Sequence, residues 1–341
     1  MYRSLRVTDA YEETPGFRII RFGDGHGISY EPGQYLTLVR IEAGEEVRRS
    51  YSILSLPSEG ESLAIGVKRV ANGLFSRWLV DTVTIGDEVT TTGAAGFFTL
   101  PEKVHDGESL VFFAAGSGIT PVYALVRRAL ACFPEALVVL AYSSPSAEQT
   151  PFLSELALLA KQYLNRIRID HFFSNERDLS RARLHREEIR RYASRYGSRS
   201  WYFACGPESY LRLCTYTLQE SGVARDRIRR ENFGVEGLKQ PVALPPDKED
   251  RIVMIRWNGE ERSVLVRYPE SILRACKKAG INLPYSCEAG RCGQCVARCT
   301  RGKVWLAANE VLTDTELEKG LVLTCVGHPA GGPVTLETGT A

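Results

Sequence analysis

Four cysteines with a characteristic spacing constrain this chain more than any other feature of its sequence. Cys287, Cys292 and Cys295 are spaced C-x4-C-x2-C, and Cys325 follows after 29 intervening residues. This is the plant-type spacing of the ligands to a [2Fe–2S] cluster. Two irons bridged by two sulfides need four thiolates on a loop that curls around them, and the glycines between the cysteines let backbone N–H groups turn toward the sulfurs. We therefore expect these four cysteines to hold a [2Fe–2S] cluster.

Two other uses of the cysteines stay open at this point. Structural zinc also takes four cysteines, although usually as two C-x2-C pairs, and only one such pair is present. A thioredoxin-like dithiol would need the pair near a βαβ pattern, which the surrounding sequence does not show. Of the remaining cysteines, Cys299 falls outside the spacing and is interpreted as an ordinary thiol. Cys132, Cys214 and Cys276 lie in apolar helical settings and are predicted to be in the core.

Length and composition restrict the class of protein. A chain of 341 residues is long for one hydrophobic core and predicts two or three domains. The net charge of +2 argues against a dedicated nucleic-acid-binding protein, and no apolar run approaches a membrane span. The N-terminus has no apolar signal-peptide core. Nine cysteines in so large a chain indicate reduced thiols, some of them holding a metal, so we expect a cytoplasmic protein.

The character of the sequence changes along the chain and predicts three domains. Residues 1–104 contain short β-rich runs bounded by proline, glycine and aspartate, which predict an antiparallel β-barrel. Residues 105–235 alternate apolar strands with helical stretches, which predicts an α/β domain whose parallel sheet is covered on both faces. Residues 236–250 combine prolines and charges without any period and are interpreted as a linker. Residues 251–341 form the third domain.

The third domain carries its own structural signals. Asn258-Gly259 between two β-rich runs is a strong hairpin signal. Residues 269–280 predict an amphipathic helix, and Thr313 with Glu316 predicts a capping box. The domain resembles plant-type ferredoxins throughout its length, through the runs LPYSCEAGRCGQC and LVLTC. The resemblance implies a β-grasp fold.

Two short motifs lie in the predicted barrel. Arg49 and Tyr51 are two residues apart in RRSYSIL, so on a strand both side chains point to one face, where an arginine can pair with a phosphate and a tyrosine can pack on a flat ring. The run GVKRVANGLFSRWL holds a turn from Gly73 to Ser76 that leads into a helix start able to bind a pyrophosphate. Each motif alone is equally typical of an ordinary strand or turn.

Together, at this separation, the two motifs resemble the flavin-binding barrel of the ferredoxin–NADP reductase superfamily. The resemblance implies FAD as the cofactor, although the motifs alone also fit FMN. It implies that Arg49 contacts the flavin phosphates, that Tyr51 packs on the isoalloxazine ring and that Ser52 lies near the flavin N5. The full flavin-binding set that it implies is Arg49, Tyr51, Ser52, Val67, Lys68, Gly73, Leu74, Phe75 and Ser76.

A strand-to-helix turn in the α/β region is suited to an anionic ligand. Gly116 and Gly118 let the backbone approach an anion, and Thr120-Pro121 predicts an N-cap followed by proline at the first helical position. The fingerprint G-x-G-x-x-G is absent, which argues against an ordinary Rossmann dehydrogenase. Without context the glycines also fit a simple tight turn. The run AAGSGITP resembles the nicotinamide-binding loop of the same superfamily.

The same resemblance extends to two later elements. CGPE lies at the end of the fourth α/β strand, where ligands gather in such sheets, and the resemblance implies that Cys205, Gly206 and Pro207 line the nicotinamide site. The run RRENFG implies that Glu231 lies near the site of hydride transfer and that Phe233 shields the flavin. In the superfamily this element ends the chain, whereas here a linker follows. The catalytic residues implied are Ser52, Cys205 and Glu231.

The choice of coenzyme depends on residues that depart from the superfamily's pattern. Ser143-Ser144 stands where relatives commonly carry Asn-Arg. Arg177 and Arg183 are candidates to bind a 2′-phosphate, which favours NADPH, with NADH as the alternative. A solvated basic helix is an equally good interpretation of these arginines.

The order of flavin barrel, nicotinamide domain and ferredoxin domain resembles the reductase components of multicomponent oxygenases. The resemblance implies a relay from NAD(P)H through FAD and a [2Fe–2S] cluster to a partner, most simply a terminal oxygenase. A reductase of the same architecture for a fatty-acid hydroxylase, a desaturase or a hybrid-cluster protein remains an alternative. So do a redox-sensing interaction protein and a zinc-binding module. No motif fixes the acceptor, the oligomeric state or the placement of the ferredoxin domain against the flavin.

Overall fold

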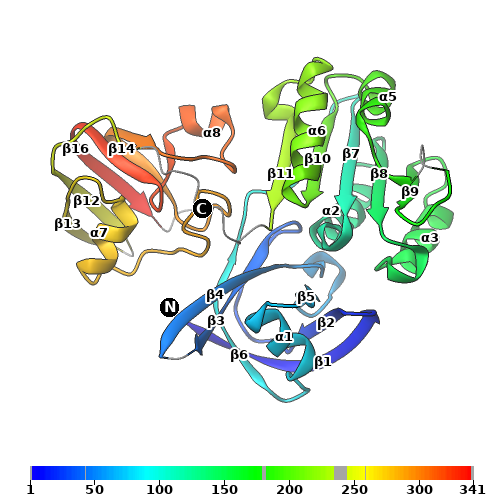
Figure 1. Cartoon of the computed structure of the whole chain (residues 1–341), viewed down its shortest axis with the longest axis horizontal. Coiled ribbons are helices and arrows are strands. Elements are labelled where there is room, and N and C mark those ends of the chain that lie inside the picture. Colours follow the sequence, from blue (N-terminus) through cyan, green and yellow to red (C-terminus); the bar gives the residue numbers. More distant parts are fainter. Residues whose placement is uncertain (1, 43, 179–181, 234–243, 258, 339–341) are drawn as a thin grey trace. The chain divides into compact units, whose positions relative to one another are not determined.

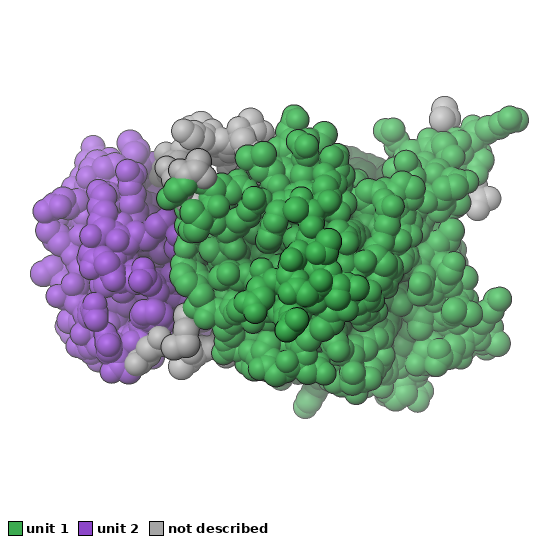
Figure 2. Space-filling view, turned by 90° about the horizontal axis from the view of Figure 1, so that it is seen from below, with its two compact units in different colours: residues 1–234 green, residues 235–341 purple. Residues whose placement is uncertain are grey.

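The chain divides into two compact units, which comprise residues 1–234 and 235–341 (Figures 1 and 2). The computed structural model describes residues 2–42, 44–178, 182–233, 244–257 and 259–338. Within these ranges, no helix combines the length and the apolar character needed to cross a membrane. The first unit contains a barrel and an α/β domain, and the second is a small mixed sheet with two helices.

The first six strands form the predicted antiparallel sheet, in the order β4-β3-β6-β1-β2-β5. An isolated bridge between Ile53 and Ile65 joins the end of β4 to β5, so the sheet curls back on itself as a barrel. Alternate residues of its strands point inward and form one hydrophobic cluster. The elements are β1 (Arg3–Thr14), β2 (Phe17–Phe22), β3 (Tyr35–Glu42), β4 (Glu45–Ser52), β5 (Ala64–Lys68), α1 (Leu74–Asp81) and β6 (Glu88–Ala95).

The α/β domain is a five-stranded parallel sheet in the order β11-β10-β7-β8-β9. Leu110 and Phe112 of β7 face α2 and α3, whereas Val111 and Phe113 face α5 and α6. The prediction of a sheet covered on both faces is therefore confirmed (Figure 1). The elements are β7 (Ser109–Ala115), α2 (Ile119–Cys132), β8 (Leu137–Ser144), α3 (Leu153–Gln162), β9 (Ile167–Phe173), α5 (Arg186–Tyr196), β10 (Trp201–Gly206), α6 (Glu208–Glu220) and β11 (Ile228–Asn232).

The second unit is a five-stranded mixed sheet in the order β13-β12-β16-β14-β15, with β12 and β16 parallel. The predicted hairpin is present because β12 pairs antiparallel with β13, while Asn258 of its turn lies outside the described residues. The capping box of Thr313 and Glu316 is confirmed. The elements are β12 (Arg251–Trp257), β13 (Glu260–Val266), α7 (Ile272–Lys278), β14 (Val296–Leu306), α8 (Asp314–Glu318), β15 (Leu321–Leu323) and β16 (Gly327–Thr338).

Only part of the segment 236–250, which we interpret as a linker, lies within the described residues. Residues 236–243 lie outside the described residues. Within 244–250, the Asp247 carboxylate accepts hydrogen bonds from the Gly331 N–H at 2.8 Å and from Arg251 at 3.1 Å. The end of the proposed linker is thus attached to the second unit.

One prediction about the core is wrong. Cys214 and Cys276 are buried as expected, but Cys132 is exposed. Cys132 is the last residue of α2 and lies one helical turn after the half-buried Arg128, whereas the next residue, Phe133, still packs against the core cluster. The helical pattern was right, but it did not show which side of the last turn faces solvent.

Candidate functional site: a flavin and nicotinamide site and a cysteine loop

The three predicted catalytic residues lie together, although they come from distant parts of the sequence. Ser52 ends β4 of the barrel, and its hydroxyl donates a hydrogen bond to the Glu231 carboxylate at 3.4 Å. Glu231 on β11 is paired in register with Cys205 on β10, so these two residues are neighbours across adjacent parallel strands. Cys205 is completely buried and Ser52 nearly so. The arrangement joins the barrel to the carboxyl ends of the parallel strands, where ligands gather in such sheets.

The electrostatics of this group favour uncharged side chains. Burial raises the pKa of Glu231 to about 8, and the hydrogen bond from Ser52 partly offsets this. Glu231 as a whole is only partly buried, so the rise in its pKa reflects the burial of its carboxyl group. Burial raises the pKa of the Cys205 thiol well above its usual value, and the charge of Glu231 adds to this. At neutral pH the pair therefore offers a carboxylic acid and a thiol, both of which can donate hydrogen bonds.

Arg49 and Tyr51 lie on one face of β4, as their spacing predicts. Tyr51 is packed 6.1 Å from the ring of Phe75, and burial raises the pKa of its hydroxyl. The Arg49 guanidinium is exposed and donates to the carbonyl of Arg48 at 2.8 Å. A half-buried aromatic ring beside an exposed cation suits a flat ring system that ends in phosphates.

The Gly73–Ser76 turn caps α1, with Gly73 at the N-cap position. The Ser76 hydroxyl donates to the Gly73 carbonyl at 3.1 Å and accepts from the Val70 N–H at 3.2 Å, so it fixes the turn. A Cβ on Gly73 would lie 2.5 Å from the Ser76 Oγ, so a larger residue here would displace the Ser76 hydroxyl from its position in the turn. Of the other predicted flavin residues, Val67 and Phe75 are buried, whereas Leu74 is 67% exposed next to the helix start.

The predicted nicotinamide turn lies against Cys205. Gly116 has a φ of +54°, and a Cβ on Gly118 would lie 2.2 Å from the Cys205 carbonyl oxygen, so the two loops approach more closely than any side chain allows. The nicotinamide and flavin sets also meet, because a Cβ on Gly116 would lie 3.8 Å from the Lys68 Nζ. Pro207, the residue before α6, is exposed beside Gly206.

The predicted helix start at Thr120 is wrong by two residues. The helix α2 begins at Ile119, with Gly118 at the N-cap. The Thr120 hydroxyl instead donates to the Ser117 carbonyl at 3.0 Å. A short 3₁₀ turn over Gly116–Gly118 leads directly into the helix, which places Thr120 inside its first turn. Phe233, expected to shield the flavin, is 36% exposed after the end of β11.

The four predicted cluster ligands lie together in the second unit as two pairs. The thiols of Cys287 and Cys292 are hydrogen-bonded to each other, and so are those of Cys295 and Cys325. All nine cysteines fall within the described residues, and none forms a disulfide. In the described part of the chain, no three metal-binding side chains converge on a single ion. Two pairs suit two irons with two thiolates each better than they suit one tetrahedral zinc.

Backbone N–H groups point at the sulfurs of the loop. The Ala289 N–H donates to Cys287 Sγ at 3.5 Å, and the backbone at Gly290 contacts Cys325 in the same way. The hydrogen bond from Cys292, with these backbone donors, lowers the pKa of the Cys287 thiol to about 6. The same hydrogen bond raises the pKa of the Cys292 thiol, so within this pair Cys287 is the residue that more readily becomes a thiolate, the form that ligates a metal. Cys295 and Cys325 are buried, whereas Cys287 and Cys292 are partly exposed.

Two residues that support the loop escaped prediction. Arg291, between the ligands, forms an ion pair with Glu310 at 3.2 Å, and the exposed fractions of the two side chains are 11% and 25%. The Glu310 N–H also donates to the Gly290 carbonyl at 3.0 Å. No motif marks Glu310, because only the fold brings it to the loop.

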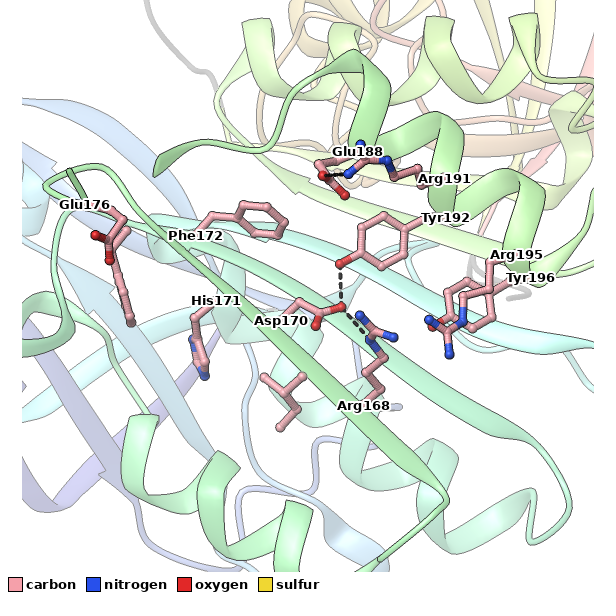
Figure 3. A pocket seen from close by; sticks show the side chains of 12 residues that line it. Arg168, Asp170, His171, Phe172, Glu176, Glu188, Arg191, Tyr192, Arg195 and Tyr196 are labelled. Carbon is pink, nitrogen blue, oxygen red and sulfur yellow. Dashed lines mark hydrogen bonds and ion pairs between the residues drawn. The ribbon is translucent and has the colours of Figure 1, made fainter. Parts of the chain in front are cut away.

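A cavity of about 630 Å³ lies elsewhere in the α/β domain, between the edge strand β9 and α5 (Figure 3). None of the predicted site residues line it. Its central charges are paired with one another, because Asp170 accepts from Tyr192 at 2.6 Å and from Arg168 at 2.8 Å, and Glu188 binds Arg191. We therefore take the convergence of Ser52, Cys205 and Glu231, and not this cavity, as the candidate functional site.

Comparison with known proteins gives the same three-part organisation. Residues 4–100 match the oxidoreductase FAD-binding domain, residues 112–215 the oxidoreductase NAD-binding domain, and residues 255–330 the 2Fe-2S iron-sulfur cluster binding domain. The crystal structure of phthalate dioxygenase reductase is 23% identical, with a TM-score of 0.61 over 99% of this chain and 98% of that chain, and so has the same fold. These domains together define an NAD(P)H-dependent oxidoreductase that uses FAD and a [2Fe–2S] cluster.

Comparison of whole sequences identifies the family of the chain more narrowly. A 1,2-phenylacetyl-CoA epoxidase subunit from Escherichia coli is 30% identical over 98% of this chain and 97% of that protein. The chain belongs to the ferredoxin–NADP reductase superfamily of flavoproteins with a C-terminal 2Fe–2S domain, and within it to the family of this epoxidase component. The ferredoxin reductase component of 3-ketosteroid-9-alpha-monooxygenase from Rhodococcus rhodochrous is 29% identical over 98% of this chain and 96% of that protein. The runs PGQYLTL, RRSYSI and GVKRV already resemble the epoxidase component.

Proposed function

We propose that the chain passes electrons from NAD(P)H to the terminal oxygenase of a phenylacetyl-CoA epoxidase-type multicomponent monooxygenase. The observation that carries this proposal is the match to the epoxidase component along nearly the whole of both chains. When bound, NAD(P)H supplies a hydride from its nicotinamide C4 to the flavin N5, and the [2Fe–2S] cluster carries one electron at a time. The protein's part is to hold these groups in place and to control protons near them.

Ser52, Cys205 and Glu231 are proposed to form the catalytic group. Because Ser52 and Glu231 are hydrogen-bonded to each other, a neutral Glu231 carboxyl could donate to the Ser52 oxygen and leave the Ser52 hydroxyl free to donate toward the flavin N5 position, where charge changes during transfer. Cys205 is too deeply buried to act as a thiolate, so we propose that it forms an apolar wall behind the nicotinamide.

The residues around this group are proposed to bind the cofactors. Tyr51 would pack on the flavin ring, with Arg49 and the Gly73–Ser76 turn at the phosphates. The nicotinamide nucleotide would lie between the Gly116–Thr120 turn and the Cys205–Pro207 loop, whose backbones touch. The remaining contacts proposed are Val67, Lys68, Leu74, Phe75 and Phe233.

Cys287, Cys292, Cys295 and Cys325 are proposed to ligate the cluster as the two observed pairs. Because the pair of Cys287 and Cys292 is the more exposed one, electrons would leave toward the acceptor on that side. We also propose domain limits of 1–104, 105–235 and 251–341, NADPH as the preferred coenzyme, and a cytoplasmic location.

Reconstitution with purified oxygenases tests the acceptor. The protein with NADPH is mixed with the oxygenase components of a phenylacetyl-CoA epoxidase and, separately, with a 3-ketosteroid-9-alpha-monooxygenase oxygenase, since the reductase of the latter is almost as similar. The proposal predicts product from phenylacetyl-CoA and little from the steroid. Product from the steroid alone would contradict the proposal and would identify a steroid monooxygenase as the type of acceptor. Product from neither, with dye reduction intact, would point to another acceptor.

A further inference from the structure

The barrel and the α/β domain of the first unit share one hydrophobic cluster, and the aromatic residue Phe152 belongs to it. Phe152, at the start of α3, is stacked on Tyr123 of α2 at 4.4 Å with an angle of 5°. Its other side meets the edge of Phe17, from β2 of the barrel, at 6.0 Å. Phe152 has a φ of +63°, and its N–H donates to the barrel residue Glu13 at 3.0 Å. Both packing and a hydrogen bond therefore hold this non-glycine residue in a left-handed conformation.

Close to Phe152, a set of ion pairs also joins the α/β domain to the barrel. The Arg127 guanidinium, on α2, binds the carboxylates of both Glu59 and Glu61, which are two residues apart in the segment before β5 of the barrel. The Arg127 side chain is 13% exposed, and its guanidinium lies over the Tyr123 ring at 5.4 Å. Glu61 also accepts a hydrogen bond from the Leu56 N–H at 2.7 Å, which anchors it to its own loop. A largely buried arginine that binds one anchored carboxylate, Glu61, and a second, more exposed one, Glu59, is a stiffer contact than an exposed surface pair.

The helix α2 connects this contact to the nicotinamide turn. Thr120, in the first turn of α2, lies so close to the barrel that a Cβ on Gly66 of β5 would be 2.9 Å from its Cγ2. Arg127 lies two turns further along the helix, at about 10 Å by the rise of an α-helix. A rigid helix attached to the barrel at two points cannot tilt against it. The orientation of the Gly116–Thr120 turn relative to the barrel is thereby set.

We propose that Arg127 is a positioning residue for hydride transfer, because its ion pairs with Glu59 and Glu61 fix the nicotinamide-binding turn relative to the flavin-binding barrel. Arg127 touches neither predicted set of cofactor residues and acts through α2. Transfer between two bound rings is sensitive to misplacement, and a shift of about 1 Å can cost about a hundredfold in rate. The inference rests on the proposed placement of the two cofactors on either side of this boundary.

The test compares three changes in the full-length, FAD-loaded protein: Arg127→Met, Arg127→Lys, and the double change Glu59→Gln with Glu61→Gln. Flavin reduction by saturating NADPH is followed by anaerobic stopped flow. Arg127→Met is expected to slow it about 10- to 100-fold and to weaken the long-wavelength absorbance of the nicotinamide–flavin complex, with FAD content unchanged. Arg127→Lys is expected to recover part of the rate because it keeps the charge. Combining Arg127→Met with the double change should add little further loss.

A control variant removes an arginine with two carboxylate partners from inside a single domain. Arg190 binds Glu187 at 2.8 Å and Glu220 at 3.5 Å and links α5 to α6 inside the α/β domain, with its side chain 44% exposed against 13% for Arg127. Arg190→Met should leave the rate and the absorbance near those of the wild type. Hydrogen exchange of the protein without cofactors supplies a second measure, in which Arg127→Met, but not Arg190→Met, should expose both residues 54–63 and residues 119–127.

The outcomes that overturn the inference are distinct from failure of the proposed function. A wild-type flavin that NADPH does not reduce would remove the proposed function itself. A normal wild type with an unchanged Arg127→Met rate and absorbance would overturn the positioning role alone. Equal losses in the Arg127 and Arg190 variants would also overturn it, because they would reflect stability. If Arg127→Met does not fold, the rates of Arg127→Lys and of the two-glutamine variant decide the question in the same way.

Discussion

Gly118 offers a sharp test of the site's geometry because the backbone of another loop lies where its side chain would be. A Cβ at this position would be 2.2 Å from the Cys205 carbonyl oxygen and 2.9 Å from the Gly206 nitrogen. Ordinary van der Waals contact begins near 3.4 Å, so Gly118→Ala must separate the two loops by about 1 Å. These are the two loops proposed to enclose the nicotinamide. The change is expected to slow flavin reduction by about tenfold to a hundredfold, and the overpacking should cost about 1–3 kcal/mol of unfolding free energy.

The assay is anaerobic stopped-flow reduction of the bound flavin over a range of NADPH concentrations, with FAD content and thermal unfolding measured in parallel. Gly23→Ala is the control, since a Cβ there would meet the methyl group of Thr8 at 3.2 Å and the Arg6 carbonyl oxygen at 3.9 Å, both within the barrel, and so needs no separation of loops. The control should reduce its flavin at the wild-type rate. If Gly118→Ala also does so, the close approach of the two loops has no part in binding the nicotinamide, and the reasoning is refuted.

Three further predictions concern other parts of the site. Because the cysteine loop belongs to a separate unit, Cys325→Ser should remove the cluster's absorbance and acceptor reduction while NADPH still reduces the flavin; loss of both would contradict this. Glu231 has a raised pKa, about 8, so the folded state holds its proton more tightly than the unfolded chain, and this contribution to stability is lost as the pH rises from about 4 through 8. Glu231→Gln should therefore gain stability relative to the wild type between about pH 6 and 9 in denaturant unfolding, and a constant difference would be the contrary result. Arg291→Gln breaks the ion pair with Glu310 and should speed cluster loss to a chelator, whereas an unchanged rate would show that the pair does not hold the loop.

The sequence predicted the parts of the structure that depend on local pattern. The cysteine spacing, the capping box of Thr313 and the alternation of strands and helices all reflect physics that acts within a few residues. The convergence of Ser52 with Glu231 is a different case. Family resemblance supplied it, since no local signal links residues 179 positions apart.

The features that escaped prediction are tertiary. Cys132 continues an apolar helical pattern, but it lies on the solvent-facing side of the last turn of α2 while Phe133 beside it packs against the core. Thr120 is a good N-cap residue by type, yet the 3₁₀ turn before it starts the helix earlier. In the sequence, Arg127 and Phe152 look like ordinary helix and loop residues, because their contacts form only when the barrel packs against the α/β domain. The periodicity of apolar residues does not predict such contacts, which are seen only in the folded structure.

Anaerobic titration of the as-purified protein with NADPH and, separately, with NADH tests the central claim most directly. Visible absorbance follows the flavin, and electron paramagnetic resonance follows the cluster. A relay predicts that at least one coenzyme bleaches the flavin band and that the spectrum of a reduced [2Fe–2S] cluster then appears, with NADPH the more effective. A colourless protein with one bound zinc, or a flavin and a cluster that neither coenzyme reduces, would contradict the account.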